Sequence, residues 1–142
     1  MGCADSDGYI HDAQCVVYTG PDTRYQGSQI CFGFNEDTLT IYDVTDKSNP
    51  KVIFRLGYQG SVYTHQGWLN ADMTSLLLND ELDEQRGTTI GQRTRTYVWD
   101  ISDLENAFEN AELFWSRPRG FRKHSKPSEH ALANILVLSS VS

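Results

Sequence analysis

Hydrophobic and polar residues alternate in short runs along most of the first 115 residues, and turn-forming residues separate these runs. β-Branched and aromatic residues dominate them, which is typical of β-strands. The clearest run is 38–44, where Leu39 and Ile41 alternate with polar side chains. A period of two indicates a strand with one buried face. The pattern predicts strands over 13–18, 30–34, 38–44, 51–56, 62–68, 75–79 and 94–101.

One segment, 103–114, carries a helical pattern instead. Leu104, Ala107, Phe108 and Ala111 fall at positions i, i+3, i+4 and i+7, and residues that can cap a helix precede them. We therefore expect one helical insertion among the strands. Because strand-sized runs at short spacing favour a sandwich, a barrel or a propeller, the insertion does not change the predicted all-β class.

The chain also contains an internal repeat. His11 and His65, 54 residues apart, each precede an Asn-Glu or Asp-Glu pair and then a strand. That strand ends in an Asp-x-x-Asp turn, and the two turns lie 57 residues apart. A repeat of this size is close to the roughly 40–50 residues of a four-stranded propeller blade.

The repeated turns suggest structural roles for their residues. Carboxylates in tight turns accept backbone N–H groups, and proline suits the start of an edge strand, where a missing donor is harmless. We expect these roles for Asp43, Asp46, Pro50, Asp100 and Asp103.

Four segments of the sequence resemble a known protein family. The segment LTIYDVTDKSNPKVI resembles the LVIVD repeat, and DGYIHDAQCVVY, QICFGFNEDTLTIYDVTD and YTHQGWLNADMTSLLLNDELDE resemble choice-of-anchor B proteins. The resemblance covers about residues 7–115. It implies a β-propeller, an extracellular or cell-surface setting, no established activity, and a Cys15–Cys31 disulfide. The residues alone leave two buried free thiols as an equal alternative to that disulfide, which requires an oxidising compartment.

The predicted fold is thus all-β: a partial propeller of about two four-stranded antiparallel blades, 9–56 and 57–115, within 7–115. We expect 116–142 to be a basic linker with a short apolar end, irregular in structure. Closed propellers need roughly 4–8 blades, so we expect a fragment, a truncated product or a piece that remaining blades or another chain completes. The first residues lack the basic start and apolar run of a secretory signal.

Charge narrows the range of partners. The net charge is −7, with 18 acidic and 7 basic residues before position 116 and 1 acidic and 5 basic after it. Nucleic acids and anionic membranes attract Lys and Arg, so neither is an expected partner. The longest apolar stretch, 131–141, is shorter than the roughly 20 residues of a spanning helix, so we expect no membrane insertion.

The best candidate site follows from the repeat. Inner strands of a propeller line its axis, so equivalent imidazoles and nearby carboxylates could converge there on a divalent cation, zinc or calcium. The alternative is that each histidine satisfies backbone groups between blades. The candidate ligands are His11, Asp12, His65, Gln66, Asp80 and Glu81.

Two functions compete. The first is a non-catalytic binding or scaffold module for an unidentified protein or carbohydrate ligand. The alternative is a metal-dependent hydrolase with His11 and His65 as ligands and Asp80 or Glu81 as general base. Neither a Gly-x-Ser-x-Gly elbow nor a glycine-rich phosphate loop occurs in the sequence.

Overall fold

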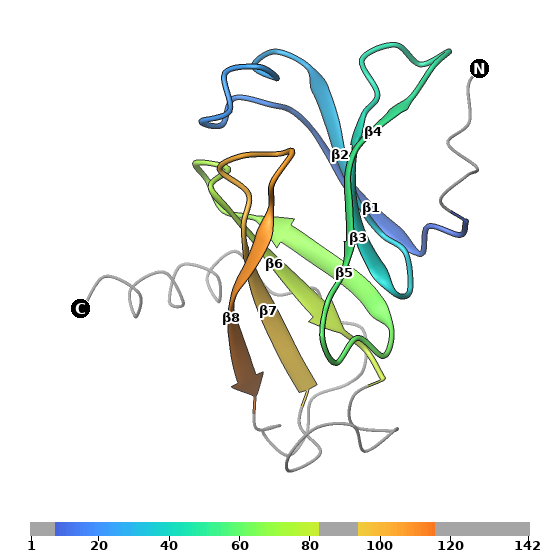
Figure 1. Cartoon of the computed structure of the whole chain (residues 1–142), viewed down its shortest axis with the longest axis vertical. Coiled ribbons are helices and arrows are strands. Elements are labelled where there is room, and N and C mark those ends of the chain that lie inside the picture. The colour runs from blue at the N-terminus through green and yellow to red at the C-terminus, as the bar shows by residue number, and fades with distance from the viewer. Residues whose placement is uncertain (1–7, 83–93, 116–142) are drawn as a thin grey trace.

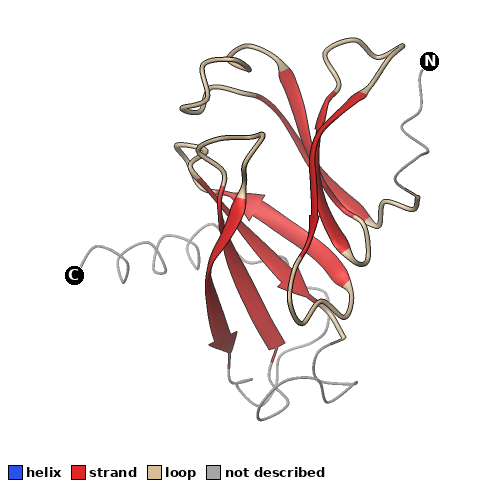
Figure 2. Ribbon diagram, viewed as in Figure 1, coloured by secondary structure: helices blue, strands red, loops and turns tan. Residues whose placement is uncertain are grey.

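The computed structural model describes residues 8–82 and 94–115, which fold into two four-stranded antiparallel sheets (Figure 1). In the first sheet the strands follow one another in chain order: β1 (Asp12–Val17), β2 (Gln29–Phe34), β3 (Thr38–Asp43) and β4 (Lys51–Gly57). The second sheet repeats this order with β5 (Thr64–Leu69), β6 (Ser75–Asp80), β7 (Thr94–Asp100) and β8 (Phe108–Trp115). Every regular element of the described residues is a strand (Figure 2). The fold is therefore all-β and partial-propeller-like, as predicted.

The seven strands predicted from alternation are all present, and each boundary lies within two residues of its prediction. The prediction of a helix over 103–114 is wrong. A tight turn holds Leu104 in the core, and Phe108 then begins β8, which pairs with β7 along the length of that strand. A helix would leave the outer edge of β7 without backbone partners, so sheet pairing overrides a weak helical propensity.

The core lies between the two sheets. Alternate residues of β2, β3, β6 and β7 point to the shared side, and their side chains form one hydrophobic cluster with residues of the flanking loops. Its largest fully buried members are Trp99, Tyr18, Tyr97, Phe32, Phe34, Ile30, Leu39, Ile41, Leu76, Leu78, Ile101 and Leu104. Because a single four-stranded sheet cannot bury an apolar face alone, stacking of the two sheets accounts for this arrangement.

Strand β5 makes the closest approach between the sheets, since it contacts both β1 and β2. The backbone N–H of Leu69 donates to the side-chain oxygen of Gln14 at 2.8 Å. At Gly67 the Phe34 ring lies so close that an added Cβ would meet its carbon atoms at 2.6 Å. The same Cβ would also lie 2.6 Å from the carbonyl oxygen of Leu77 in β6, so both the packing between sheets and the pairing within the second sheet require glycine here.

Three sequence predictions concern other features of the chain. The predicted linker and apolar end, 116–142, lie outside the described residues. Among the residues that are described, no helix has the length and hydrophobicity needed to cross a membrane.

Cys15 and Cys31 are register partners in β1 and β2, and a disulfide joins them. Their Cα atoms are 4.1 Å apart, close to the roughly 4.5 Å of a non-hydrogen-bonded antiparallel pair.

Candidate functional site

The two repeated histidines lie against each other where the sheets meet. His11 immediately precedes β1, and His65 is the second residue of β5. An isolated bridge between Glu36 and Thr64 brings the start of β5 beside the β2–β3 turn. As a result, Nδ1 of His65 is 2.7 Å from Nε2 of His11, and the ring centroids are 4.7 Å apart.

Glu81 completes this group, and we refer to His11, His65 and Glu81 as the His–His–Glu cluster. The Glu81 Oε2 atom is 3.5 Å from Nδ1 of His65, and one possible ligand atom of each residue lies within 4.8 Å of the others. The Glu81 backbone N–H donates to the carbonyl of Tyr63 at 3.0 Å, which fixes this residue just beyond β6. All three side chains are partly buried.

Asp80, the neighbouring candidate, has a different position. It is fully buried, and its carboxylate accepts the backbone N–H groups of Val62 at 2.8 Å and Tyr63 at 2.9 Å. The Tyr58 hydroxyl donates to the same carboxylate at 3.2 Å, and burial raises the pKa of that phenol. Asp80 therefore closes the loop before β5 and is not part of the His–His–Glu cluster.

The other two candidate ligands also lie outside this cluster. Asp12 is the first residue of β1, and its carboxylate accepts the backbone N–H of Ala13 at 2.9 Å. Gln66 follows His65 in β5 and is the register partner of Asn79 in β6. Of the six residues predicted as ligands, the structure thus brings three together.

Tyr63 connects the cluster to a neighbouring pocket. Its hydroxyl lies 3.1 Å from Nδ1 of His11, and the two rings meet edge to face with centroids 5.0 Å apart. Burial, followed by hydrogen bonding to Glu36, holds the pKa of the Tyr63 phenol above its usual value. Tyr63 therefore orients His11 from the side of the ring that faces away from His65.

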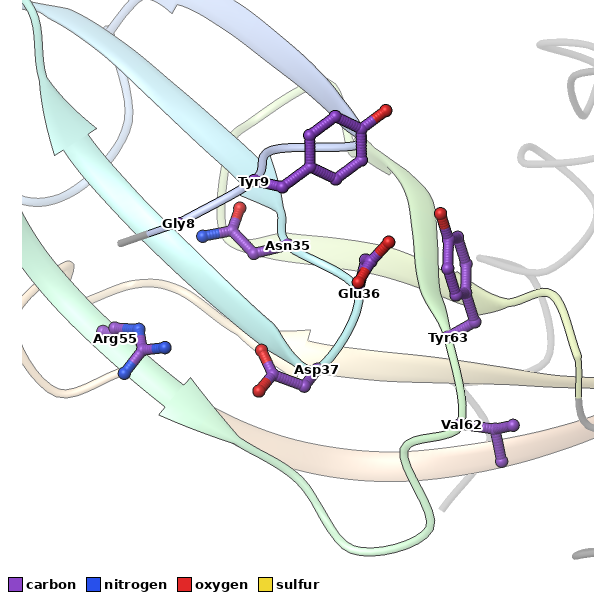
Figure 3. A pocket seen from close by; sticks show the side chains of 8 residues that line it. All are labelled: Gly8, Tyr9, Asn35, Glu36, Asp37, Arg55, Val62 and Tyr63. Carbon is purple, nitrogen blue, oxygen red and sulfur yellow. The ribbon is translucent and has the colours of Figure 1, made fainter. Parts of the chain in front are cut away.

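The pocket is open and has a volume of about 560 Å³ (Figure 3). Two tyrosines, an amide, two carboxylates and a guanidinium contribute to its lining, and the Tyr9 side chain is largely exposed. Its lining residues are Gly8, Tyr9, Asn35, Glu36, Asp37, Arg55, Val62 and Tyr63. The sequence patterns did not single out Tyr9, Asp37 or Arg55, because the three lie on separate segments.

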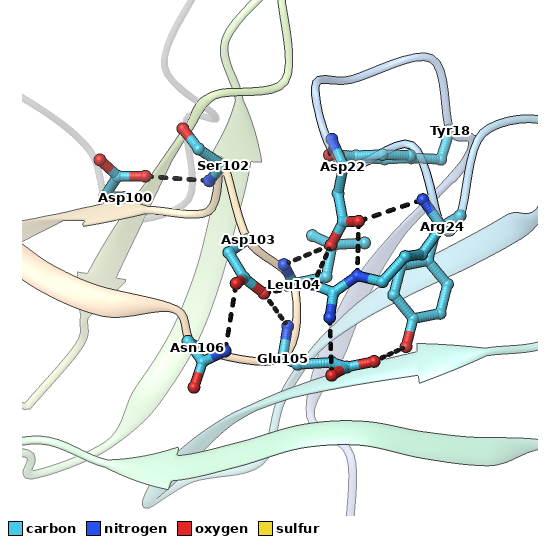
Figure 4. Close-up of polar contacts among 10 residues, drawn as sticks. Tyr18, Asp22, Arg24, Asp100, Ser102, Asp103, Leu104, Glu105 and Asn106 are labelled. Atoms are coloured by element: carbon cyan, nitrogen blue, oxygen red, sulfur yellow. Dashed lines mark hydrogen bonds and ion pairs between the residues drawn. The ribbon is translucent and has the colours of Figure 1, made fainter.

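At the other end of the strands, an ionic network joins the sheets (Figure 4). Asp22, in the β1–β2 loop, is 7% exposed and accepts the backbone N–H of Leu104, in the β7–β8 turn, at 3.0 Å. The Arg24 guanidinium binds both Asp22 carboxylate oxygens, at 2.8 and 2.7 Å. These hydrogen bonds hold the pKa of Asp22 at about 2.

Arg24 extends the network to the second sheet. Its guanidinium pairs with the carboxylates of Asp103 and Glu105, the latter at 2.7 Å. Tyr25 donates to Glu105 at 2.8 Å, and burial together with this bond raises the pKa of Tyr25 to about 12. No sequence signal linked Asp22 or Arg24 with this turn, which lies about 80 residues further along the chain.

The predicted turn residues have equivalent bonds in both sheets. Asp43 accepts the N–H of Thr45, and Asp100 accepts the N–H of Ser102, each at 2.9 Å. In each turn the second aspartate makes the same kind of bond, to the backbone N–H group two residues further along the chain.

Asp46 accepts the N–H of Ser48 at 2.9 Å, and Asp103 accepts that of Glu105 at 3.0 Å. Pro50 directly precedes β4, one of the two edge strands of the first sheet. The internal repeat is therefore visible in the turn geometry as well as in the strands.

No protein-family profile matches the chain, and a search of curated proteins found no match.

Proposed function

We propose that the chain is a non-catalytic binding or scaffold module of an extracellular or surface-anchored LVIVD-repeat propeller protein. The pocket between Tyr9 and Tyr63 carries this proposal. The exposed Tyr9 ring and the half-buried Tyr63 ring lie beside amide, carboxylate and guanidinium groups, a set that suits the faces and hydroxyl groups of a sugar. The ligand class we propose is therefore a carbohydrate.

The position of Asp80 favours binding over hydrolysis. A general base needs a carboxylate within reach of a water molecule or a substrate proton. Asp80 is fully buried, and three donors already occupy its oxygens. Of the two carboxylates considered for the hydrolase, only Glu81 remains beside the histidines.

The setting outside the cytoplasm rests on the disulfide. A bond between Cys15 and Cys31 persists in oxidising compartments and is reduced in most cytosols. The repeat of two blade-like sheets and the wording of the LVIVD-type segments support the family assignment.

Binding can be tested on an array of polysaccharides with the purified chain. Replacing Tyr9 with Ala should lower the affinity for a bound glycan about three- to tenfold, the range expected for one aromatic contact. Phe108→Ala is the matched control. It removes an aromatic side chain whose exposed fraction is similar to that of Tyr9, and Phe108 does not line the pocket. Binding that Tyr9→Ala leaves intact would contradict the proposed site. Turnover of ester or phosphoester substrates that Glu81→Gln abolishes would instead establish the hydrolase.

A further inference from the structure

We propose that the His–His–Glu cluster binds one Zn²⁺ ion and that this ion joins the first sheet to the second. His11 immediately precedes β1 of the first sheet, whereas His65 lies in β5 and Glu81 directly follows β6, both strands of the second sheet. Two imidazole nitrogens and one carboxylate oxygen are a donor set that Zn²⁺ prefers. Calcium takes six to eight oxygen ligands, so this set selects against it.

The three ligand atoms lie within 4.8 Å of one another, so a tetrahedral ion requires side-chain movements of up to about 1.5 Å. Ligand nitrogens at Zn–N distances of about 2.0–2.1 Å lie roughly 3.3 Å apart in a tetrahedron. The Glu81 Oε2 atom is already 3.5 Å from Nδ1 of His65. The two imidazole nitrogens are 2.7 Å apart and would need to separate by about 0.6 Å. The backbone N–H of His11 donates to the carbonyl of Phe34 in β2 at 2.9 Å, so the shift must come from side-chain rotation and not from movement of the backbone.

The surroundings prepare His11 as a ligand. Metal-bound histidines commonly donate their second ring N–H to an oxygen, which leaves the other nitrogen with its lone pair available. Nδ1 of His11 lies 3.1 Å from the Tyr63 hydroxyl, while Nε2 points at His65. Tyr63 is thus a positioning residue for the proposed ion.

The chemical role of the ion follows from its place. Three protein ligands leave a fourth position for water. Because the ligands come from both sheets, an ion that binds only the folded chain stabilises the contact between them by mass action. This inference does not depend on the carbohydrate proposal, since none of the three proposed ligands lines the pocket, although Tyr9 and Tyr63 of its lining lie beside His11.

The test is titration of the metal-free full chain with Zn²⁺ alone, followed by calorimetry and thermal unfolding. We expect one ion per chain and a higher melting temperature with Zn²⁺ but not with Ca²⁺. His11→Ala, His65→Ala and Glu81→Gln should each weaken binding at least tenfold. Tyr63→Phe should weaken it by about 10- to 100-fold, as loss of an outer-shell partner does.

Two controls make the outcome decisive. Asp12→Asn changes the residue beside His11 that lies outside the cluster, and it should leave the Zn²⁺ affinity unchanged. A variant with Cys3, His124 and His130 replaced removes the histidines and the cysteine outside the described residues and should retain the site. Should a histidine variant fail to fold, Co²⁺ substitution of the wild type and of Glu81→Gln decides instead. The proposal is overturned if Zn²⁺ does not bind, if binding survives loss of the ligands, or if Co²⁺ lacks a tetrahedral spectrum.

Discussion

The ionic network around Asp22 makes folding stability depend on acidity in a defined window. An aspartate in an unfolded chain has a pKa of about 3.9, whereas the Arg24 and Leu104 bonds hold the pKa of Asp22 at about 2 in the folded protein. Because the folded pKa is the lower one, the unfolded chain binds the proton more readily. The stabilisation is therefore complete above about pH 4 and is lost as the pH falls toward 2.

Its size follows from the same difference. Each pKa unit corresponds to about 1.4 kcal/mol, which sets a ceiling of roughly 2.5 kcal/mol for Asp22. The Arg24 side chain is 45% exposed, so solvent screens its part of the interaction. We expect about 1 kcal/mol to remain at neutral pH.

Urea denaturation of wild type and Asp22→Asn between pH 2 and pH 7 measures this contribution. The difference in unfolding free energy should be constant from about pH 5 to pH 7 and should shrink below pH 4. In an Arg24→Met background the same substitution should cost less, because the Asp22 carboxylate then keeps only the backbone N–H groups of residue 24 and Leu104 as donors. A difference that persists unchanged to pH 2, or an Asp22→Asn protein as stable as wild type at pH 6, would refute the reasoning.

Two further predictions concern packing and the covalent link. Gly67→Ala would place a methyl group 2.6 Å from the Phe34 ring, so we expect a loss of about 1–3 kcal/mol of unfolding free energy in urea. Gly57→Ala, whose added Cβ has its nearest neighbour at 3.5 Å, is the control, and equal losses in both variants would show the packing argument to be wrong. Reduction of the Cys15–Cys31 disulfide, which closes a 16-residue separation, should cost about 3 kcal/mol. The urea midpoint should fall with dithiothreitol in the wild type but not in the double serine variant, and an unchanged wild-type midpoint would contradict this.

The elements that sequence could predict are those that local patterns encode. Alternation in the run containing Leu39 and Ile41 predicts the strand itself. The expectation of one buried face is wrong, because Thr40 and Tyr42 on the opposite face of β3 are buried as well. The turn at Asp43 is also local, because its carboxylate bonds to the residue two positions on. The segment after Asp103 is ambiguous, since a buried Leu104 in a turn followed by an edge strand produces the same spacing as a helical face.

The site was predictable only as far as the repeat reaches. Equivalent positions in two blades identified His11 and His65, which do lie together. The choice between Asp80 and Glu81 depends on which carboxylate the β4–β5 loop captures. The alternation of β6 carries a signal for it, because Asp80 continues the buried face of Leu76 and Leu78. Arg24 meets its partners through tertiary packing alone, and its neighbours in sequence give no sign of the second sheet.

The placement of the polar groups suggests how the two sheets keep their relative orientation. His11 lies at the start of β1 and Asp22 beyond its end, so the His–His–Glu cluster and the Asp22–Arg24 network occupy opposite ends of the interface. The hydrophobic cluster between them supplies most of the attraction, but apolar contacts are non-directional and permit sliding. Hydrogen bonds at both ends are directional, so together they favour one alignment of the sheets. Loss of the His–His–Glu cluster or of the Asp22–Arg24 network should therefore affect the angle between the two sheets more than the pairing of strands within each sheet.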